Sequence, residues 1–216
     1  MPKAGPLPDH LIARYRDWRE GTHAANLSYY EELASKGQHP QEMIISCCDS
    51  RVHVTSIFGA TSGELFIHRN IAGLVPPCEP AGDRHGTSAA VEYAVAFLGI
   101  NHLIVMGHSN CGGVAGCYAM CSGTAPELEK RGSFVGGWME ILRPGYDRLA
   151  PEANEAARMT QLEKEAVIVS LENLMTFPFV AERVASGDLA LHGLYTDIAA
   201  GSLDVYDPET HAFIPV

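Results

Sequence analysis

Short apolar runs alternate with longer helical patterns along most of this chain, and this alternation constrains the fold more than any other feature. Strands separated by helices indicate βαβ units and a mainly parallel sheet. We therefore predict an α/β fold with a mainly parallel central sheet of four or five strands, flanked by helices. The runs that read as strands are 42–46, 64–70, 102–108 and 189–198, with 202–207 as a hairpin partner of the last. Helical patterns occupy 85–99, 112–120 and 152–176, and Gly- and Pro-rich short helices are expected over 122–150.

The first 35 residues are expected to form an extended helical arm ahead of the first strand. After a proline-rich start, Asp9 is placed to cap a helix over about 9–34. Leu11, Tyr15 and Trp18 fall at i, i+4 and i+7 and form an apolar stripe on it. This stripe is expected to pack on the body or on another subunit. The 216 residues suit a single domain, 1–216, with 1–35 as its arm.

Charge and composition exclude several classes of partner. The formal net charge is -11 and the pI is about 5.3, which argues against nucleic acid or an anionic membrane surface. No apolar run approaches the ~20 residues that span a bilayer, and the N-terminus lacks the apolar stretch of a secretory signal. We therefore expect a cytoplasmic protein. Six cysteines are too sparse for a disulfide scaffold and are expected to be ligands, nucleophiles or core residues.

The stretch IISCCDSRV, 44–52, closes the first predicted strand with two adjacent cysteines. Side chains alternate along a strand, so Cys47, Asp49 and Arg51 would point one way if the extended path continued. Cys48 and Ser50 would point the other way. The two cysteines are therefore not expected to serve one small site together. The carboxyl edge of an open α/β sheet is where such proteins bind ligands.

A second motif, MGHSNCGG at 106–113, closes the third predicted strand. His108 and Cys111 are three residues apart, and the helix beginning at Gly112 offers free backbone N–H groups that favour an anion. One thiol from each strand end with His108 makes two Cys and one His with a vacant fourth position, the pattern of a catalytic zinc site. Isolated buried cysteines are usually core residues, and this is the interpretation given to Cys78, Cys117 and Cys121.

Together the two motifs resemble those of the β-class carbonic anhydrases. The resemblance spans roughly 37–207 and includes KGQHP, CCDSRV, GELFIHRNIAGLVPP, AAVEYAV, MGHSNCGG, SLENLMTFPFV and LHGLYTDI, in the order of the family. It implies that Cys47, His108 and Cys111 bind one Zn²⁺, and that Asp49 and Arg51 form the catalytic dyad. The implied reaction is reversible hydration of CO2 to bicarbonate and a proton, by attack of zinc-bound hydroxide that the dyad orients.

The resemblance also implies a substrate pocket and an assembly. The open-site, plant-like branch of the family lines its CO2 pocket with a Gln, a Phe and a Tyr from two subunits. These fall on Gln38, Phe66 and Tyr93 here, and the backbone of Gly112 is added to the substrate-binding set. A homo-oligomer is therefore expected, either a dimer or a dimer of dimers.

A second branch of the family closes its zinc site with the dyad Asp and has an inhibitory bicarbonate pocket. That pocket uses a Trp and a Tyr, which are replaced here by Ile44 and Thr196; its Arg matches Arg69, a residue shared more widely. This favours the open, water-bound form. Departures from the family are Cys48, where Ser is usual, and His53, where Pro is common.

Other functions stay open from the sequence. The same fold would suit a hydrolase of CO2-like molecules such as carbonyl sulfide or carbon disulfide. A non-catalytic zinc or bicarbonate sensor would not need an oriented hydroxide, and the intact Asp49–Arg51 pair argues against it unless that pair is only structural. A redox protein would use Cys47 and Cys48.

Overall fold

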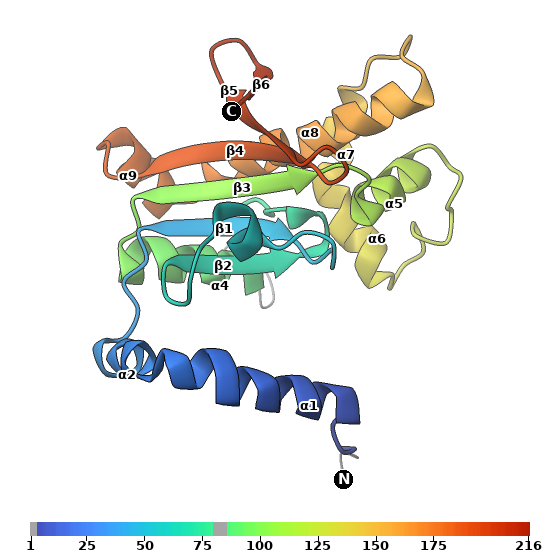
Figure 1. Ribbon diagram of the computed structural model, residues 1–216. Coiled ribbons are helices and arrows are strands. Elements are labelled where there is room, and N and C mark those ends of the chain that lie inside the picture. Colours follow the sequence, from blue (N-terminus) through green and yellow to red (C-terminus); the bar gives the residue numbers. More distant parts are fainter. Residues whose placement is uncertain (1–3, 80–85) are drawn as a thin grey trace. The chain divides into compact units, whose positions relative to one another are not determined.

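The computed structural model describes residues 4–79 and 86–216, and the chain divides into two compact units, Met1–His39 and Pro40–Val216. The larger unit is built on a six-stranded sheet with the order β2-β1-β3-β4-β5-β6 (Figure 1). The strands are β1 (Glu42–Cys47), β2 (Leu65–Asn70), β3 (His102–His108), β4 (Ala190–Asp197), β5 (Ser202–Asp207) and β6 (Ala212–Pro215).

The first four strands of the sheet are parallel, and β5 and β6 are added antiparallel at one edge. This confirms the predicted α/β class, the mainly parallel sheet and the hairpin of β4 and β5. The sheet has six strands rather than four or five because β6 was not predicted. It has four residues, three of them exposed and one a proline, so it lacks the apolar run that marks a buried strand.

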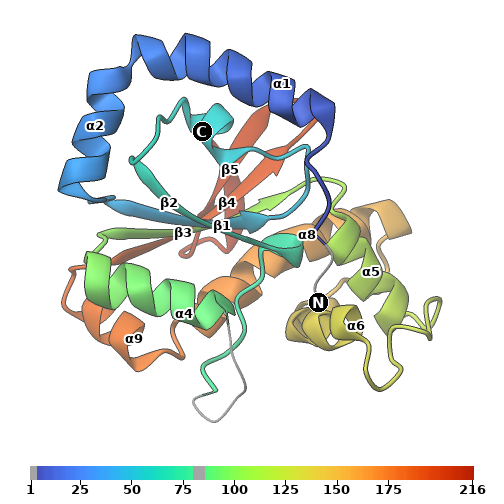
Figure 2. The same ribbon diagram turned by 90° about the horizontal axis from the view of Figure 1, so that it is seen from below.

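Three helices cover one face of the sheet: α4 (Gly86–Glu92), α8 (Glu155–Leu174) and α9 (Pro178–Ala185) (Figure 2). Met43 and Ile45 of β1 and Leu103 and Val105 of β3 pack in one cluster with Val167 of α8 on this face. Ile44 and Met106 belong to a separate cluster. A shift of one residue in register would exchange the two sets, so this alternation specifies the register of β1 and β3.

The remaining helices of this unit are short. The predicted helix 85–99 starts outside the described residues, and its described part divides into α4 and a π-helical segment. Pro178 is the first residue of α9, a position where its missing N–H costs no helical hydrogen bond. No helix in the described ranges is both long and apolar enough to cross a membrane. The short helices are α3 (Val54–Phe58), η2 (Ile71–Gly73), η3 (Tyr93–Leu98), α5 (Gly112–Cys121), α6 (Phe134–Met139), η4 (Glu140–Leu142) and α7 (Arg143–Asp147).

The smaller unit holds the arm, which has two helices where one was predicted. They are α1 (Asp9–Trp18) and α2 (Leu27–Lys36), joined through the π-helical segment η1 (Arg19–His23). The rings of Trp18 and His23 have centroids 5.0 Å apart, and those of His23 and Tyr30 stack at 4.7 Å. None of the residues in these three helices is buried.

Two adjacent glycines at the start of α5 give a matched test of packing. A Cβ on Gly113 would lie 2.8 Å from Ile71 Cγ2 and 3.0 Å from Ala72 Cβ, whereas a Cβ on Gly112 meets nothing within 4 Å. We expect Gly113→Ala to lower the free energy of unfolding by about 1–3 kcal/mol, because overpacking forces neighbours to move. Gly112→Ala is expected to be neutral or to stabilise by up to about 1 kcal/mol. Urea unfolding of the metal-free variants measures both, and equal stabilities would contradict the predicted difference.

Candidate metal centre

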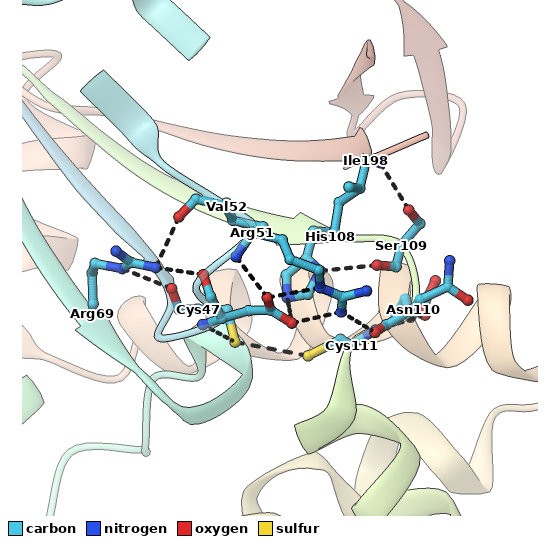
Figure 3. Close-up of polar contacts among 11 residues, drawn as sticks. Cys47, Arg51, Val52, Arg69, His108, Ser109, Asn110, Cys111 and Ile198 are labelled. Carbon is cyan, nitrogen blue, oxygen red and sulfur yellow. Dashed lines mark hydrogen bonds and ion pairs between the residues drawn. The ribbon is translucent and has the colours of Figure 1, made fainter. Parts of the chain in front are cut away.

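The carboxyl ends of β1 and β3 bring three metal-binding side chains together. β1 and β3 are neighbours in the sheet; Cys47 ends β1, His108 ends β3, and Cys111 is the N-cap of α5. Their ligand atoms all lie within 4.8 Å of one another, and the three residues are buried. Among the His, Cys, Asp and Glu residues that the structure describes, no other group of three does this. The predicted pairing of one thiol from each strand end with His108 is therefore present in the fold (Figure 3).

The hydrogen bonds of His108 leave one ring nitrogen available to a metal. Nδ1 lies 2.9 Å from the carbonyl oxygen of Ser109, which only accepts, so Nδ1 must carry the proton. In the neutral ring Nε2 then holds a lone pair. Nε2 is buried and has no hydrogen-bond partner among the described residues. A buried polar atom without a partner is costly, and a metal ion at the three-residue group would satisfy it.

The two thiols of the group also fit a cation. Cys47 Sγ and Cys111 Sγ are 3.9 Å apart. The hydrogen bond from the Cys111 thiol lowers the pKa of Cys47, and the same contact raises the pKa of Cys111. Two thiolates at this distance repel each other, so without a cation only one of them ionises readily. A bound divalent cation would allow both to be thiolates.

Beside the metal group, Arg51 holds Asp49 with two side-chain hydrogen bonds. Arg51 Nε donates to Oδ1 at 3.0 Å and a terminal nitrogen donates to Oδ2 at 2.7 Å; the Arg51 backbone N–H adds a third bond to Oδ1 at 2.9 Å. These contacts with Arg51 hold the pKa of Asp49 well below its usual range. Asp49 Oδ2 lies 4.0 Å from His108 Nε2. An ionised hydrogen-bond acceptor therefore lies at the edge of the candidate metal site.

Asp49 and Arg51 meet in a turn and not, as predicted, by pointing the same way along an extended strand. The strand ends at Cys47, and the backbone turns, with the Val52 N–H donating to the Asp49 carbonyl at 3.0 Å. Strand alternation therefore separates buried Cys47 from exposed Cys48, but it does not extend to Arg51. The turn brings Asp49 and Arg51, the predicted dyad, into contact.

Arg69 fixes this turn from the neighbouring strand. Its guanidinium donates at 2.8 Å to the carbonyl oxygens of Cys47, Asp49 and Val52. Arg51 reaches across to the second motif by donating to the Asn110 carbonyl at 2.9 Å. The loop that follows β1 and the loop that follows β3 are thus tied together (Figure 3). This role of Arg69 was not predicted, because an Arg in a half-buried strand does not reveal from its position which carbonyls its side chain reaches.

Glu163 is a further residue at the centre that the sequence did not single out. Its Oε1 accepts the backbone N–H of Cys111 at 3.2 Å, and its Oε2 accepts the hydroxyl of Tyr195 at 2.7 Å. Only 5% of Glu163 is exposed. The available signal was its place among the buried positions of α8, which are residues 162, 163, 166, 167, 169, 170 and 174.

The predicted pocket residues Phe66 and Tyr93 do not join the metal ligands within one chain. They contact each other, with ring centroids 5.9 Å apart. Phe66 pairs with Met43, four residues before Cys47 in β1, which is roughly 13 Å along a strand at 3.3 Å per residue. Gln38 belongs to the smaller unit of the chain. Their role as a CO2 pocket stays a prediction.

A pocket of about 680 Å³ is lined in part by Cys111 and Gly112. Its wall includes Glu163, Asp197 and Asp204. Three carboxyl groups do not suit an apolar molecule such as CO2 or an anion such as bicarbonate. The substrate site is therefore expected elsewhere, and the predicted anion contact of Gly112 stays untested.

Comparison with known proteins identifies the family. Residues 42–203 match the family model for carbonic anhydrase. β-Carbonic anhydrase 3 of Arabidopsis thaliana is 36% identical over 202 residues, which is 92% of this chain and 76% of that protein. The structure of the β-carbonic anhydrase CcaA superposes with a TM-score of 0.82 at 32% identity, covering 96% of this chain and 98% of that one. A tetrameric β-carbonic anhydrase of Sordaria macrospora gives a TM-score of 0.75 at 29% identity, covering 91% and 95%. This chain therefore belongs to the β-carbonic anhydrases, a family of enzymes.

Proposed function

We propose that this protein is a zinc-dependent carbonic anhydrase that hydrates CO2 reversibly to bicarbonate and a proton. The observation that carries the proposal is the buried group of Cys47, His108 and Cys111, whose ligand atoms lie within 4.8 Å of one another. The family match and the 36% identity to a plant β-carbonic anhydrase support the reaction.

The donor set suits one zinc ion per chain. Two thiolates and a neutral imidazole are ligands that Zn²⁺ prefers, and their two negative charges balance its charge. Three protein ligands leave a fourth tetrahedral position, as in catalytic zinc sites. When bound there, zinc would act as a Lewis acid that lowers the pKa of a water and makes it a nucleophile near neutral pH.

The proposed role of Asp49 is to orient the attacking oxygen. Because Arg51 keeps it ionised, Asp49 can accept a hydrogen bond but cannot donate one. An O–H group of the nucleophile that donates to Asp49 turns its lone pair away from the carboxylate and toward CO2. Arg51 fixes the carboxylate with a two-point contact, so little rotational freedom is lost when the nucleophile binds.

We infer the open, water-accessible form of the site. Both oxygens of Asp49 are already bonded to Arg51, at 3.0 and 2.7 Å. A carboxylate that became a metal ligand would have to give up at least part of this contact. Ile44 and Thr196 also replace the Trp and Tyr of the bicarbonate pocket found in the closed branch.

We propose that the active unit is a homo-oligomer in which Gln38, Phe66 and Tyr93 complete the CO2 pocket across subunits. Two features of this chain support it. Phe66 pairs with Met43, four residues before Cys47 along the strand, and Tyr93 contacts Phe66 rather than the metal group. The arm leaves Leu11, Tyr15 and Trp18 exposed by 43%, 54% and 42%, and such apolar surface favours a partner. A relative from Sordaria macrospora is described as tetrameric.

Stopped-flow CO2 hydration by the zinc-loaded protein tests the proposed reaction. We expect activity that rises between about pH 6.5 and 9, because thiolate ligands donate more charge than imidazoles and leave the metal-bound water less acidic than the pKa of about 7 found with three histidines. The same preparation after removal of zinc by a chelator is the control and should be inactive.

Two results would contradict parts of the proposal. Activity that collapses to zero below about pH 8 would indicate the closed site with Asp49 as a ligand. Stoichiometric zinc without CO2 hydration at any pH would overturn the proposed reaction. Hydrolysis of carbonyl sulfide or carbon disulfide by the same sample would then identify the related hydrolase, and its absence would favour a sensor.

A further inference from the structure

A buried carboxylate lies behind the candidate metal centre without a cation beside it. Glu163 is 5% exposed, and within residues 4–79 and 86–216 no lysine or arginine pairs with it; Lys164, the next residue, reaches Asp204 instead at 3.7 Å. Burying an acidic side chain is costly unless hydrogen bonds compensate. Two donors do so here, the Cys111 N–H and the Tyr195 hydroxyl.

The Cys111 N–H is the contact that points to a role. Cys111 is the N-cap of α5, where free N–H groups and the helix dipole favour a negative charge. Its own side chain makes no capping hydrogen bond, and its thiol faces the metal group. Glu163 therefore accepts the backbone N–H of Cys111, and the Cys111 sulfur remains available to a metal ion.

The turn that carries Cys111 is held at each of its residues. The Ser109 N–H donates to the Thr196 carbonyl at 2.9 Å, and the Asn110 carbonyl accepts from Arg51 at 2.9 Å. Asn110 has φ of 56°, in the left-handed region that a non-glycine residue adopts at some cost. The bond from Cys111 to Glu163 is the last restraint before the helix begins.

Glu163 is itself rigidly placed. A Cβ on Gly107, the residue before His108, would lie 2.8 Å from Val167 Cγ2 and 3.2 Å from the Glu163 carbonyl oxygen. α8 thus packs directly on the end of β3. The carboxylate of Glu163 is therefore fixed relative to both Gly107 and Cys111. A hydrogen bond from a rigid element constrains a ligand more than one from a mobile side chain.

On these contacts, and on the proposed zinc site, we infer that Glu163 is a positioning residue for the metal ligand Cys111. It holds the Cys111 backbone so that the sulfur of Cys111 faces Cys47 and His108 before the metal binds. Mutation of a residue that hydrogen-bonds to a metal ligand typically weakens metal affinity by about 10–100-fold. Glu163→Ala is therefore expected to raise the dissociation constant for zinc by about 10–100-fold.

Two further variants separate this role from general stability. In Glu163→Gln the amide oxygen can still accept the Cys111 N–H and the amide nitrogen can donate to Tyr195. Because a neutral hydrogen bond replaces a charged one, the zinc affinity of Glu163→Gln should fall by less than about tenfold. Ser170→Ala is the matched control: Ser170 is also buried on α8, and it accepts the Val75 N–H at 3.1 Å but does not contact the metal group. It should change zinc affinity by no more than about twofold.

The experiment measures zinc affinity by chelator competition, the visible absorption of the Co²⁺-loaded protein, and the melting temperature of the metal-free protein. We expect weaker zinc binding and a changed Co²⁺–thiolate absorption in Glu163→Ala, with most of both recovered in Glu163→Gln. Ser170→Ala should lower only the melting temperature. Zinc affinity in Glu163→Ala within about twofold of wild type, or a loss no larger than that of Ser170→Ala, would overturn this inference alone. Wild-type protein that binds no zinc would overturn the zinc proposal as well.

Discussion

Cys47→Ser is expected to abolish zinc binding and CO2 hydration, whereas Cys48→Ser leaves both near the wild-type level. Cys47 is buried and its sulfur lies 3.9 Å from that of Cys111. A serine hydroxyl does not ionise at neutral pH and supplies neither the charge nor the softness of a thiolate. Loss of a Lewis acid that contributes several kcal/mol to the transition state lowers kcat/KM by at least about 1000-fold.

Cys48 makes the comparison well matched, because the two substitutions are chemically identical and one residue apart. Cys48 is exposed, and its backbone N–H donates to the Asn70 carbonyl at 2.8 Å, a bond that serine retains. Zinc content by elemental analysis and stopped-flow hydration would be measured on both variants. Equal losses in the two variants, or full activity in Cys47→Ser, would refute the assignment of Cys47 as the ligand.

Asp49→Asn is expected to lower kcat/KM by about 100-fold while leaving zinc bound. Asparagine has nearly the same shape, and its oxygen can still accept one bond from Arg51. It has no negative charge, however, and its amide nitrogen donates where the carboxylate accepts. The nucleophile then loses the acceptor that orients it, an effect of the size seen for positioned proton-transfer groups. Ser50→Ala, in the same turn, is the control and should keep wild-type activity.

Zinc affinity in Asp49→Asn separates the open site from the closed one. With both carboxylate oxygens bonded to Arg51, zinc affinity should change little. A loss well beyond the about 100-fold that marks an outer partner of a metal ligand would indicate that Asp49 itself binds the metal. Unchanged kcat/KM would refute the orienting role and leave the pair as a structural ion pair.

The contribution of the Asp49–Arg51 pair to stability depends on pH with a defined sign. Arg51 holds the pKa of Asp49 below that of an unfolded Asp, about 3.9. The contribution of this pair to stability is therefore fully present above about pH 4 and is lost only as the pH falls through the lower pKa of the folded state. A rise of activity between pH 6.5 and 9 thus reports on another group, and Asp49→Asn should lower the whole profile without moving its midpoint.

Much of the fold could be predicted because its strands are short, apolar and separated by helical patterns. Five strands were predicted with ends that differ from the observed ones by at most one residue. The edge strand β6 and the break of the arm near Asn26 were missed, since neither changes the local hydrophobic pattern. The cytoplasmic location stays a prediction that no feature of the fold tests.

The sequence by itself determined the chemistry of the site. The residue types and their order, Cys-x-Asp-x-Arg at one strand end and His-x-x-Cys-Gly-Gly at another, specify a donor set that suits zinc and a charged pair, because ligand chemistry depends on side-chain identity. The tertiary structure decided which of these groups meet. A turn rather than a strand joins Asp49 to Arg51, Arg69 binds three carbonyls of that turn, and Glu163 supports Cys111 from a helix 52 residues away in sequence. Such contacts depend on how separate elements pack, and neither periodicity nor spacing along one segment carries that information.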